Sequence, residues 1–232
     1  MGSRYDGEAY DYVYPYVKNK LVFDVGSNIG EVTKKFIHAG ARVVAIEPQR
    51  RVTVGKNYKG VHAIKNICIS DDVNPVPFYL SGKSSTISTC FEDWKLIQNP
   101  NIKWREITMQ ATTLDNLIEE FGKPTYIKVD VEGYEHKVLG GLSQRIDFIS
   151  LEFTANYWET FSESMKIVEN LGFNKMITFQ KKKIKGTVHG VRKTLQTYKI
   201  VDEFHDVKSI IEFFKRLPDR MQGDVLIEAK EG

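Results

Sequence analysis

The sequence predicts an α/β fold in which a mainly parallel sheet is covered by helices on both faces. Short apolar runs alternate with amphipathic segments along most of the 232 residues, which is the pattern of strands connected by helices. The apolar runs lack polar alternation and are typical of strands buried on both sides. A turn with two glycines follows the first run, at the place where doubly wound sheets bind ligands.

Seven segments have the composition of strands. They are rich in apolar residues, and most of them end at a charged or turn-forming residue such as Pro48. The predicted strands are 21–25, 41–48, 61–70, 125–133, 145–153, 174–180 and 224–230.

Four segments have the spacing of helices. The first, 31–39, places Val32, Phe36 and Ile37 on roughly one face. Another helix is stopped by Gly172. The predicted helices are 31–39, a short one over 50–58, 134–142 and 162–173.

Two regions depart from this alternation. Residues 71–112 contain half-buried strand patterns, from which we expect an antiparallel excursion, with an insertion at about 81–105. Residues 1–20 are rich in tyrosine and are expected to pack as a leading segment on the main domain, 21–232, with covering of a binding site as an alternative role.

Composition narrows the classes of protein. A hydrophobic content of 41% suits one domain with a full core, and no apolar run reaches the roughly 18 residues of a membrane span. We see no signal peptide and expect a cytoplasmic protein. The net charge of +3, with acids and bases mixed, gives no reason to expect a nucleic-acid partner.

Neither the two cysteines nor the one basic cluster indicates a functional site. Cys68 and Cys90 lack the spacing of metal ligands, and Cys68 is expected to be a buried free thiol because it lies in an apolar run. The cluster KKKIK at 181–185 is interpreted as a solvated loop or strand edge rather than a phosphate or membrane patch.

The glycine turn, DVGSNIGE, indicates what kind of ligand binds there. Gly26 and Gly30 would let the backbone approach a ligand at the start of the next helix. The dinucleotide pattern G-x-G-x-x-G is absent, and Glu31 would lie awkwardly beside a pyrophosphate. A ligand with an amino-acid end fits better, and its ammonium group could face Asp24.

Acidic residues at the next two strand ends indicate what the rest of this ligand is. Glu47 can accept both hydroxyls of a ribose, and Asp71 could meet the exocyclic amine of an adenine. Together with Asp24 they outline a nucleoside that carries an amino acid, which is S-adenosylmethionine. The alternative is that these residues are ordinary polar caps and turn formers.

The fourth strand carries polar residues where a central strand would normally be apolar. Lys128, Asp130 and Glu132 alternate and so project to one side of an extended segment, where they need partners or a cleft. Glu135 follows in the first turn of a helix, a position that suits an acid.

Four strings in this order resemble the FkbM-type S-adenosylmethionine-dependent methyltransferases: DVGSNIG, AIEP, TTLDNL and IKVDVEGYEHKVLGG. The resemblance covers about residues 20–180. It implies a class I methyltransferase fold, Rossmann-like, with a seven-stranded sheet whose last strand, here 224–230, is antiparallel. It also implies methyl transfer to oxygen, commonly a hydroxyl of a sugar, a glycan or a polyketide-derived natural product.

The resemblance also implies roles for individual residues. Asp130 would lie near the methyl group, and Ser84 and Ser85 resemble a small-residue turn that helps to line the cofactor site. The cofactor residues carried over in this way are Asp24, Gly26, Ser27, Asn28, Gly30, Glu47, Asp71 and Ser85.

A hydroxyl is a poor nucleophile, so a base or a metal ion has to help remove its proton. Asp130 is the first candidate base, ahead of Glu132, Glu152 and His136, and Lys128 could orient Asp130 or form a structural ion pair. In a second, metal-assisted version of the mechanism, Asp130 and Glu152 hold a divalent ion such as Mg²⁺. We favour the metal-free version, because no dense carboxylate cluster follows the fifth strand.

The remaining alternatives come from other classes. They are a nicotinamide-dependent oxidoreductase, a binding module that keeps the fold without activity, and methylation of RNA or protein. The acceptor itself is not readable from the sequence, because specificity would lie in residues 1–20, 81–105 and 181–200. His189, in the last of these, is a candidate for a substrate contact.

Overall fold

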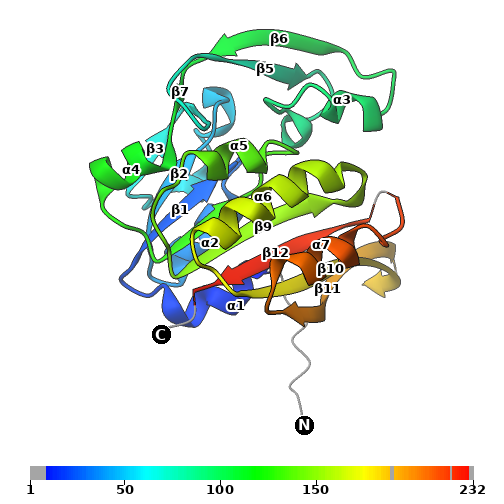
Figure 1. Cartoon of the computed structure of the whole chain (residues 1–232). Coiled ribbons are helices and arrows are strands. Elements are labelled where there is room, and N and C mark those ends of the chain that lie inside the picture. Colours follow the sequence, from blue (N-terminus) through cyan, green and yellow to red (C-terminus); the bar gives the residue numbers. More distant parts are fainter. Residues whose placement is uncertain (1–8, 189–190, 220, 230–232) are drawn as a thin grey trace.

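The computed structural model describes residues 9–188, 191–219 and 221–229. Its centre is an eight-stranded sheet in the spatial order β3-β2-β1-β8-β9-β12-β10-β11 (Figure 1). The strands are β1 (Leu21–Val25), β2 (Arg42–Ile46), β3 (Ala63–Lys65), β8 (Tyr126–Val129), β9 (Phe148–Thr154), β10 (Lys175–Val188), β11 (Val191–Phe204) and β12 (Gln222–Glu228).

The directions of the strands confirm the predicted fold class. Strands β3, β2, β1, β8 and β9 are parallel, and β12 runs antiparallel to both of its neighbours, β9 and β10. This is the class I methyltransferase arrangement with one strand, β11, added at the edge. The strand order reverses between β1 and β8, so a ligand is expected at the carboxyl ends of these two strands.

Helices cover both faces of the sheet, and each face has its own apolar core. On one face α1 (Ala9–Val13) and α2 (Glu31–His38) pack over the strands. On the other lie α4 (Leu114–Phe121), α5 (Glu135–Gly140), α6 (Trp158–Asn170) and α7 (Val207–Phe214). Strand β8 serves both cores, since Tyr126 packs on the first side, Ile127 packs on the second, and both are fully buried.

The predicted antiparallel excursion is confirmed. Strands β5 (Val76–Ser81) and β6 (Trp104–Met109) pair antiparallel, and α3 (Trp94–Ile97) lies in the long connection between them. A short pair, β4 (Cys68–Ile69) and β7 (Ala111–Thr112), joins this layer to the domain. Figure 1 shows the layer, which we call the insertion (residues 71–110), above the carboxyl ends of the central strands.

The strand predicted over 125–133 ends at Val129, so Asp130 and Glu132 lie in the turn after it rather than in an extended strand. Two other predicted elements are divided. The strand predicted over 61–70 is divided into β3 and β4 at residues 66 and 67, where the Asn66 amide donates to the Glu47 carbonyl across 2.8 Å. The helix predicted over 50–58 is two 3₁₀ turns, Arg50–Val52 and Lys56–Tyr58, separated at Gly55. Glycine at a helix interior disfavours continuation, which explains the division.

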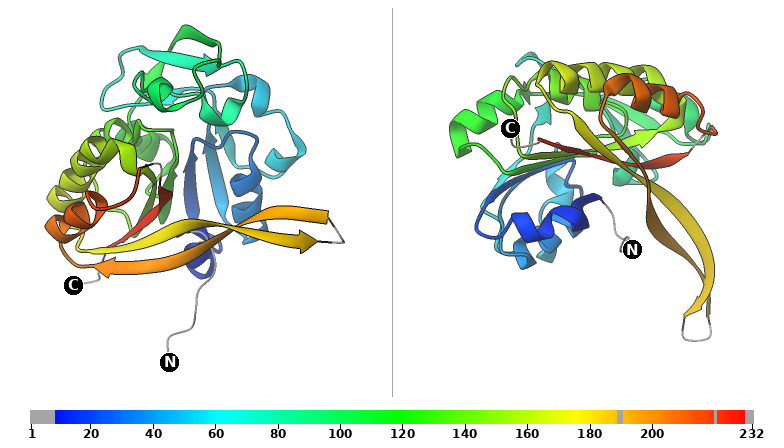
Figure 2. Two further views of the ribbon diagram at one scale, coloured as in Figure 1. Left: turned by 90° about the vertical axis from the view of Figure 1, so that its right-hand side faces the viewer. Right: turned by 60° about the horizontal axis from the view of Figure 1, so that its bottom comes forward.

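The last third of the chain differs most from the prediction. The strand predicted over 174–180 continues to Val188 and forms a long hairpin with β11, which the sequence interpretation missed together with α4 and α7. Residues 181–185 are part of β10, and both views in Figure 2 show the far half of the hairpin extending away from the sheet. His189 lies outside the described residues. Among the described helices, none has both the length and the apolar character needed to cross a membrane.

Candidate functional site

A cavity opens at the carboxyl ends of β1, β2 and β8, below the insertion. Its empty volume is about 700 Å³, counting the part open to solvent. One wall is apolar and contains Ile67, Ile69 and Phe78. The polar part of the lining includes Asn28, Glu47, Ser85, Thr89, Asp130 and Glu132.

The glycine turn adopts a left-handed backbone at three positions, Gly26, Asn28 and Gly30, with φ of 79°, 45° and 76°. A Cβ on Gly26 would lie 1.8 Å from the carbonyl oxygen of Asp130, and one on Gly30 would lie 2.7 Å from the Tyr58 ring. The glycines were expected to admit a ligand. In the structure they make room for the end of β8 and for an aromatic ring, and Gly26 also lines the cavity.

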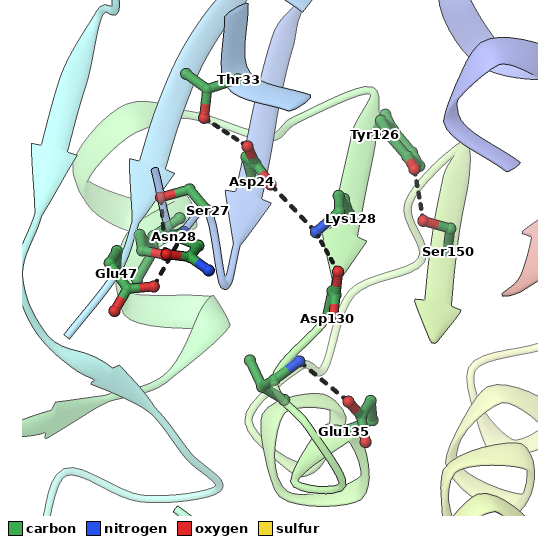
Figure 3. A network of polar contacts seen from close by, with 12 residues as sticks. Asp24, Ser27, Asn28, Thr33, Glu47, Tyr126, Lys128, Asp130, Glu135 and Ser150 are labelled. Atoms are coloured by element: carbon green, nitrogen blue, oxygen red, sulfur yellow. Dashed lines mark hydrogen bonds and ion pairs between the residues drawn. The ribbon is translucent and has the colours of Figure 1, made fainter. Parts of the chain in front are cut away.

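Glu47 lies at the cavity wall, as expected for a residue that holds a ribose. One carboxylate oxygen accepts from the Asn28 N–H at 3.0 Å and the other from the Gln49 N–H at 2.9 Å. The side chain is only 5% exposed, and burial raises its pKa above the usual range. The carboxylate is therefore fixed, with lone pairs remaining for two further donors (Figure 3).

The insertion contacts the glycine turn directly. The Ser85 hydroxyl donates to the side-chain oxygen of Asn28 at 2.8 Å, and the Gln49 amide donates to the Ser85 carbonyl at 3.2 Å. Ser84 instead closes its own turn by accepting from the Thr86 N–H. Of this pair of serines, Ser85 lines the cavity and links two walls of it.

Asp24 does not reach the cavity. It is fully buried, accepts from the Thr33 hydroxyl at 2.5 Å, and faces the ammonium of Lys128 at 3.6 Å (Figure 3). The prediction that Asp24 meets an ammonium group of the ligand is therefore corrected, since the ammonium belongs to the chain. Ser27 also turns away, with its hydroxyl shared between the Ile46 carbonyl and the Tyr58 hydroxyl.

Lys128 connects Asp24 to Asp130. Its ammonium lies 3.0 Å from an Asp130 oxygen and is almost wholly buried. Burial alone would lower the pKa of Lys128, but the two carboxylates outweigh burial and raise the pKa above its usual range. The lysine therefore remains charged and holds Asp130 in place, which fits both roles that the sequence left open.

Asp130, Glu132 and Glu152 come together although the sequence separates them. One oxygen of each lies within 4.8 Å of the others, so three carboxylates share one small volume at the ends of β8 and β9. A second cavity, on the α2 side, is lined by both Asp130 and Glu152. Its other lining residues include Tyr10, Glu31, Lys35, Lys128, Ser150 and Asp224.

The turn that carries Glu132 is held from two sides, by Glu135 and by Thr89, in a role that the sequence interpretation assigned to neither. Glu132 has φ of 59°, a left-handed conformation that costs free energy in a residue other than glycine. The Glu135 carboxylate accepts from the N–H groups of Val131 at 3.1 Å and Gly133 at 3.3 Å. Burial raises the pKa of Glu135 to about 7.

Thr89, from the insertion, holds the other side of the same turn. Its hydroxyl lies 2.9 Å from the Glu132 carbonyl and 3.2 Å from the Val131 carbonyl. It also accepts from the Phe91 N–H at 2.9 Å. The helix-start position of Glu135 was visible in the sequence, whereas Thr89 gave no signal because its contact spans 43 residues.

Two predicted site residues lie elsewhere. Asp71 forms an ion pair with Lys137 at 2.7 Å and is not among the residues that line the cavity, so the structure gives no support to the expected contact with adenine. His136 lines neither cavity and packs against the Phe91 and Tyr134 rings. Burial lowers the pKa of His136, and its Nε2 lies 3.9 Å from Glu163, away from the carboxylate cluster.

Comparison with known proteins agrees with this geometry. Residues 24–175 match the family model described as the methyltransferase FkbM domain. A curated relative, the hexuronic acid methyltransferase AglP of Haloferax volcanii, is 31% identical over 146 residues, which is 60% of this chain. The match spans 57% of the length of that relative.

Two solved structures are similar at low sequence identity. A precorrin-6y C5,15-methyltransferase from Geobacter metallireducens has a TM-score of 0.49 and 7% identity, covering 94% of this chain and 85% of that one. A SAM-dependent methyltransferase from Archaeoglobus fulgidus has a TM-score of 0.42 and 14% identity, covering 95% and 90%. The family match includes most of the chain, and the chain belongs to the FkbM family of S-adenosylmethionine-dependent methyltransferases.

Proposed function

We propose that this FkbM-family methyltransferase transfers a methyl group to a hydroxyl oxygen of a sugar, a glycan or a related natural product. The observation that carries the proposal is the position of Asp130, which lines both cavities. One cavity would hold the cofactor and the other the acceptor, so a carboxylate lies where the two would meet. Family membership decides against the nicotinamide-dependent alternative.

The lining of the first cavity fits S-adenosylmethionine. The fixed carboxylate of Glu47 suits the two hydroxyls of a ribose, and the apolar wall at Ile67, Ile69 and Phe78 suits the flat face of an adenine. Asp130 and Glu132 provide negative charge where a positively charged sulfonium would lie. When bound, S-adenosylmethionine supplies an electrophilic methyl carbon, and alignment of an acceptor oxygen with it can lower the barrier by roughly 7–11 kcal/mol.

Asp130 is the proposed general base. A carboxylate near the acceptor hydroxyl can take its proton as the oxygen becomes nucleophilic. Lys128 acts as the positioning residue, because its buried ammonium fixes Asp130 from one side. Glu132 and Glu152 are the neighbouring carboxylates that could share this task, and we place His136 after them because it lines neither cavity.

The metal-assisted version remains a proposal beside this one. Asp130, Glu132 and Glu152 offer the hard oxygen ligands that Mg²⁺ prefers, and a bound divalent ion would lower the pKa of an acceptor hydroxyl. The structure adds Glu132 to the pair named from the sequence. We favour the metal-free version, since Lys128 already neutralises part of the negative charge that would attract a cation.

The proposal is tested by calorimetry and turnover. S-adenosylhomocysteine is expected to bind with micromolar affinity while NAD does not, and Glu47→Ala is expected to weaken this binding by at least tenfold. Methyl transfer is then assayed on glycans that carry hexuronic acid and on neutral glycans, with Mg²⁺ or with EDTA.

Asp130→Asn separates binding from chemistry. It is expected to lower kcat by about 10²–10⁴ while S-adenosylhomocysteine still binds, as for loss of a general base. Full activity of Asp130→Asn would remove Asp130 as the base, and loss of activity in EDTA with recovery in Mg²⁺ would favour the metal-assisted version. Failure of folded protein to bind S-adenosylhomocysteine would overturn the proposed cofactor site.

A further inference from the structure

Two thiols meet in the wall of the cofactor cavity. Cys68 lies in β4 and Cys90 follows Thr89 in the insertion, 22 residues later. The Cys90 thiol donates to the Cys68 sulfur across 3.2 Å, and both residues line the cavity. A disulfide needs an S–S distance of about 2.05 Å, so an approach of roughly 1 Å would join them.

The two thiols differ in access. Cys68 is 2% exposed and packs in a small apolar cluster with Val76, Phe78 and Ala111, whereas Cys90 is half-buried at the edge of this cluster. The adjacent Cys90 thiol, together with burial, raises the pKa of the Cys68 thiol above its usual range. Cys90 is therefore the thiol that meets a reagent first.

We propose that Cys68 and Cys90 form a reversible disulfide that fixes the insertion over the cofactor cavity. The bond would join the insertion to β4 close to the residues by which the insertion contacts the site. Thr89, next to Cys90, holds the carbonyls of the turn that carries Glu132. Ser85, five residues earlier, holds Asn28 in the glycine turn. One covalent bond thus restrains the segment that contacts both parts of the site.

The chemistry is a thiol–disulfide exchange with a small disulfide such as oxidised glutathione. The Cys90 sulfur, after loss of its proton, attacks one sulfur of the oxidant, forms a mixed disulfide and expels one thiolate. The Cys68 sulfur then loses its proton and attacks the Cys90 sulfur, which forms the protein disulfide and expels the second thiolate. Two protein thiols are oxidised and one small disulfide is reduced to two thiols.

The disulfide would slow exchange of the cofactor. The insertion covers the cavity, so restraining it raises the barrier to the motion that admits or releases a ligand. A bound cofactor would in turn shield Cys90 from reagents. This part of the inference rests on the proposed function, whereas formation of the disulfide does not.

The test equilibrates the whole folded chain with mixtures of reduced and oxidised glutathione, then blocks remaining thiols with N-ethylmaleimide. Mass spectrometry is expected to show a species without label, two hydrogens lighter, with the peptides of Cys68 and Cys90 joined. The melting temperature should rise by roughly 5–10 °C for a loop of this length. Dissociation of S-adenosylhomocysteine, followed by stopped flow, should slow several-fold in the oxidised form.

Cys90→Ala is the control, since it leaves Cys68 without a partner and should abolish every redox-dependent difference in mass, melting temperature and dissociation rate. Two labelled thiols in strongly oxidising buffer, or a mixed disulfide that persists on Cys90, would overturn the proposal. A disulfide that leaves the dissociation rate unchanged would overturn its effect on the cofactor. If the reduced protein binds no S-adenosylhomocysteine, the proposed function fails, and mass and melting temperature still decide the disulfide.

Discussion

Gly26 shows how one missing side chain sets the geometry of the site. The turn after β1 passes so close to the end of β8 that no Cβ fits between them. The same residue has φ of 79°, which only glycine adopts without strain. The close approach brings the cofactor turn and Asp130 together, so the distance between the two halves of the site depends on Gly26.

Gly26→Ala and Gly172→Ala form a matched pair that separates these two effects. Gly172 has the same φ of 79°, but nothing lies within 4 Å of a Cβ built there. Gly172→Ala is expected to lower the free energy of unfolding by about 1–2 kcal/mol, the cost of a left-handed alanine. Gly26→Ala is expected to lower the free energy of unfolding by more than about 4 kcal/mol, because the backbone has to move as well. Chemical denaturation measures both, and equal losses would contradict the role of the contact with Asp130.

Glu135 is the other residue whose environment has a measurable consequence. Its folded-state pKa of about 7 lies above the value of about 4.3 for an unfolded chain. Between these values the folded state binds more protons than the unfolded state, so this group lowers stability as pH rises. The decrease amounts to about 3 kcal/mol between pH 4 and pH 8.

Glu135→Gln removes that titration and keeps an oxygen that can accept from the Val131 and Gly133 N–H groups. Denaturation measured from pH 4 to pH 8 is expected to show a stability curve that falls less steeply for the variant than for the wild type. The difference between the two curves should develop mainly between about pH 4.3 and pH 7. Parallel curves would mean that Glu135 titrates as it does in an unfolded chain.

At the scale of elements, the insertion forms part of the site rather than only covering it. It contributes Ser85 to the glycine turn, Thr89 to the turn of Glu132, and Cys90 to the thiol pair. The sequence located this layer correctly as an antiparallel excursion, because its alternating pattern is local. Its contacts with the turns are long-range pairings between short polar residues, which no local pattern encodes.

Ser85→Ala and Ser84→Ala test this coupling with neighbouring residues. Ser85→Ala removes the hydrogen bond to the left-handed Asn28 and is expected to weaken S-adenosylhomocysteine binding by roughly 3–10-fold, as loss of one hydrogen bond implies. Ser84→Ala removes only contacts within its own turn and should change affinity by less than twofold. Calorimetric titration of the two variants with S-adenosylhomocysteine measures these affinities. Equal losses of affinity would show that the insertion does not act through Asn28.

At the scale of the molecule, the central strands were predictable and the edge was not. Strands β1, β2, β8, β9 and β12 are mostly apolar runs bounded by turns, and these signals lie within each segment. Helix α7 also carried a local signal that was missed, with Asp206 capping it and Val207, Ile210 and Phe214 on its buried face. The hairpin of β10 and β11 depends on pairing between segments that are each rich in polar residues, so its extent could not be read locally.

The candidate site, like the fold, was predictable where strand position decides it and unpredictable where a distant contact decides it. Glu47 and Asp130 lie at strand ends and line the cavity, because the topology of such sheets fixes where strand ends go. Asp24 and Asp71 also lie near strand ends, yet their partners, Lys128 and Lys137, come from distant segments and draw them away. Strand-end position therefore predicts the neighbourhood of a side chain but not the direction in which it points.

The position of β12 has a consequence for how the chain folds during synthesis. β12 is the last described strand in the sequence, yet it pairs with β9 on one side and β10 on the other. Until residues 222–228 have left the ribosome, β9 and β10 each have an unpaired edge, and the site of Val225, Leu226 and Ile227 in the two cores is unfilled. Such edges are prone to associate with other chains. The sheet therefore closes only after residues 222–228 have been synthesised, and until then these edges stay exposed.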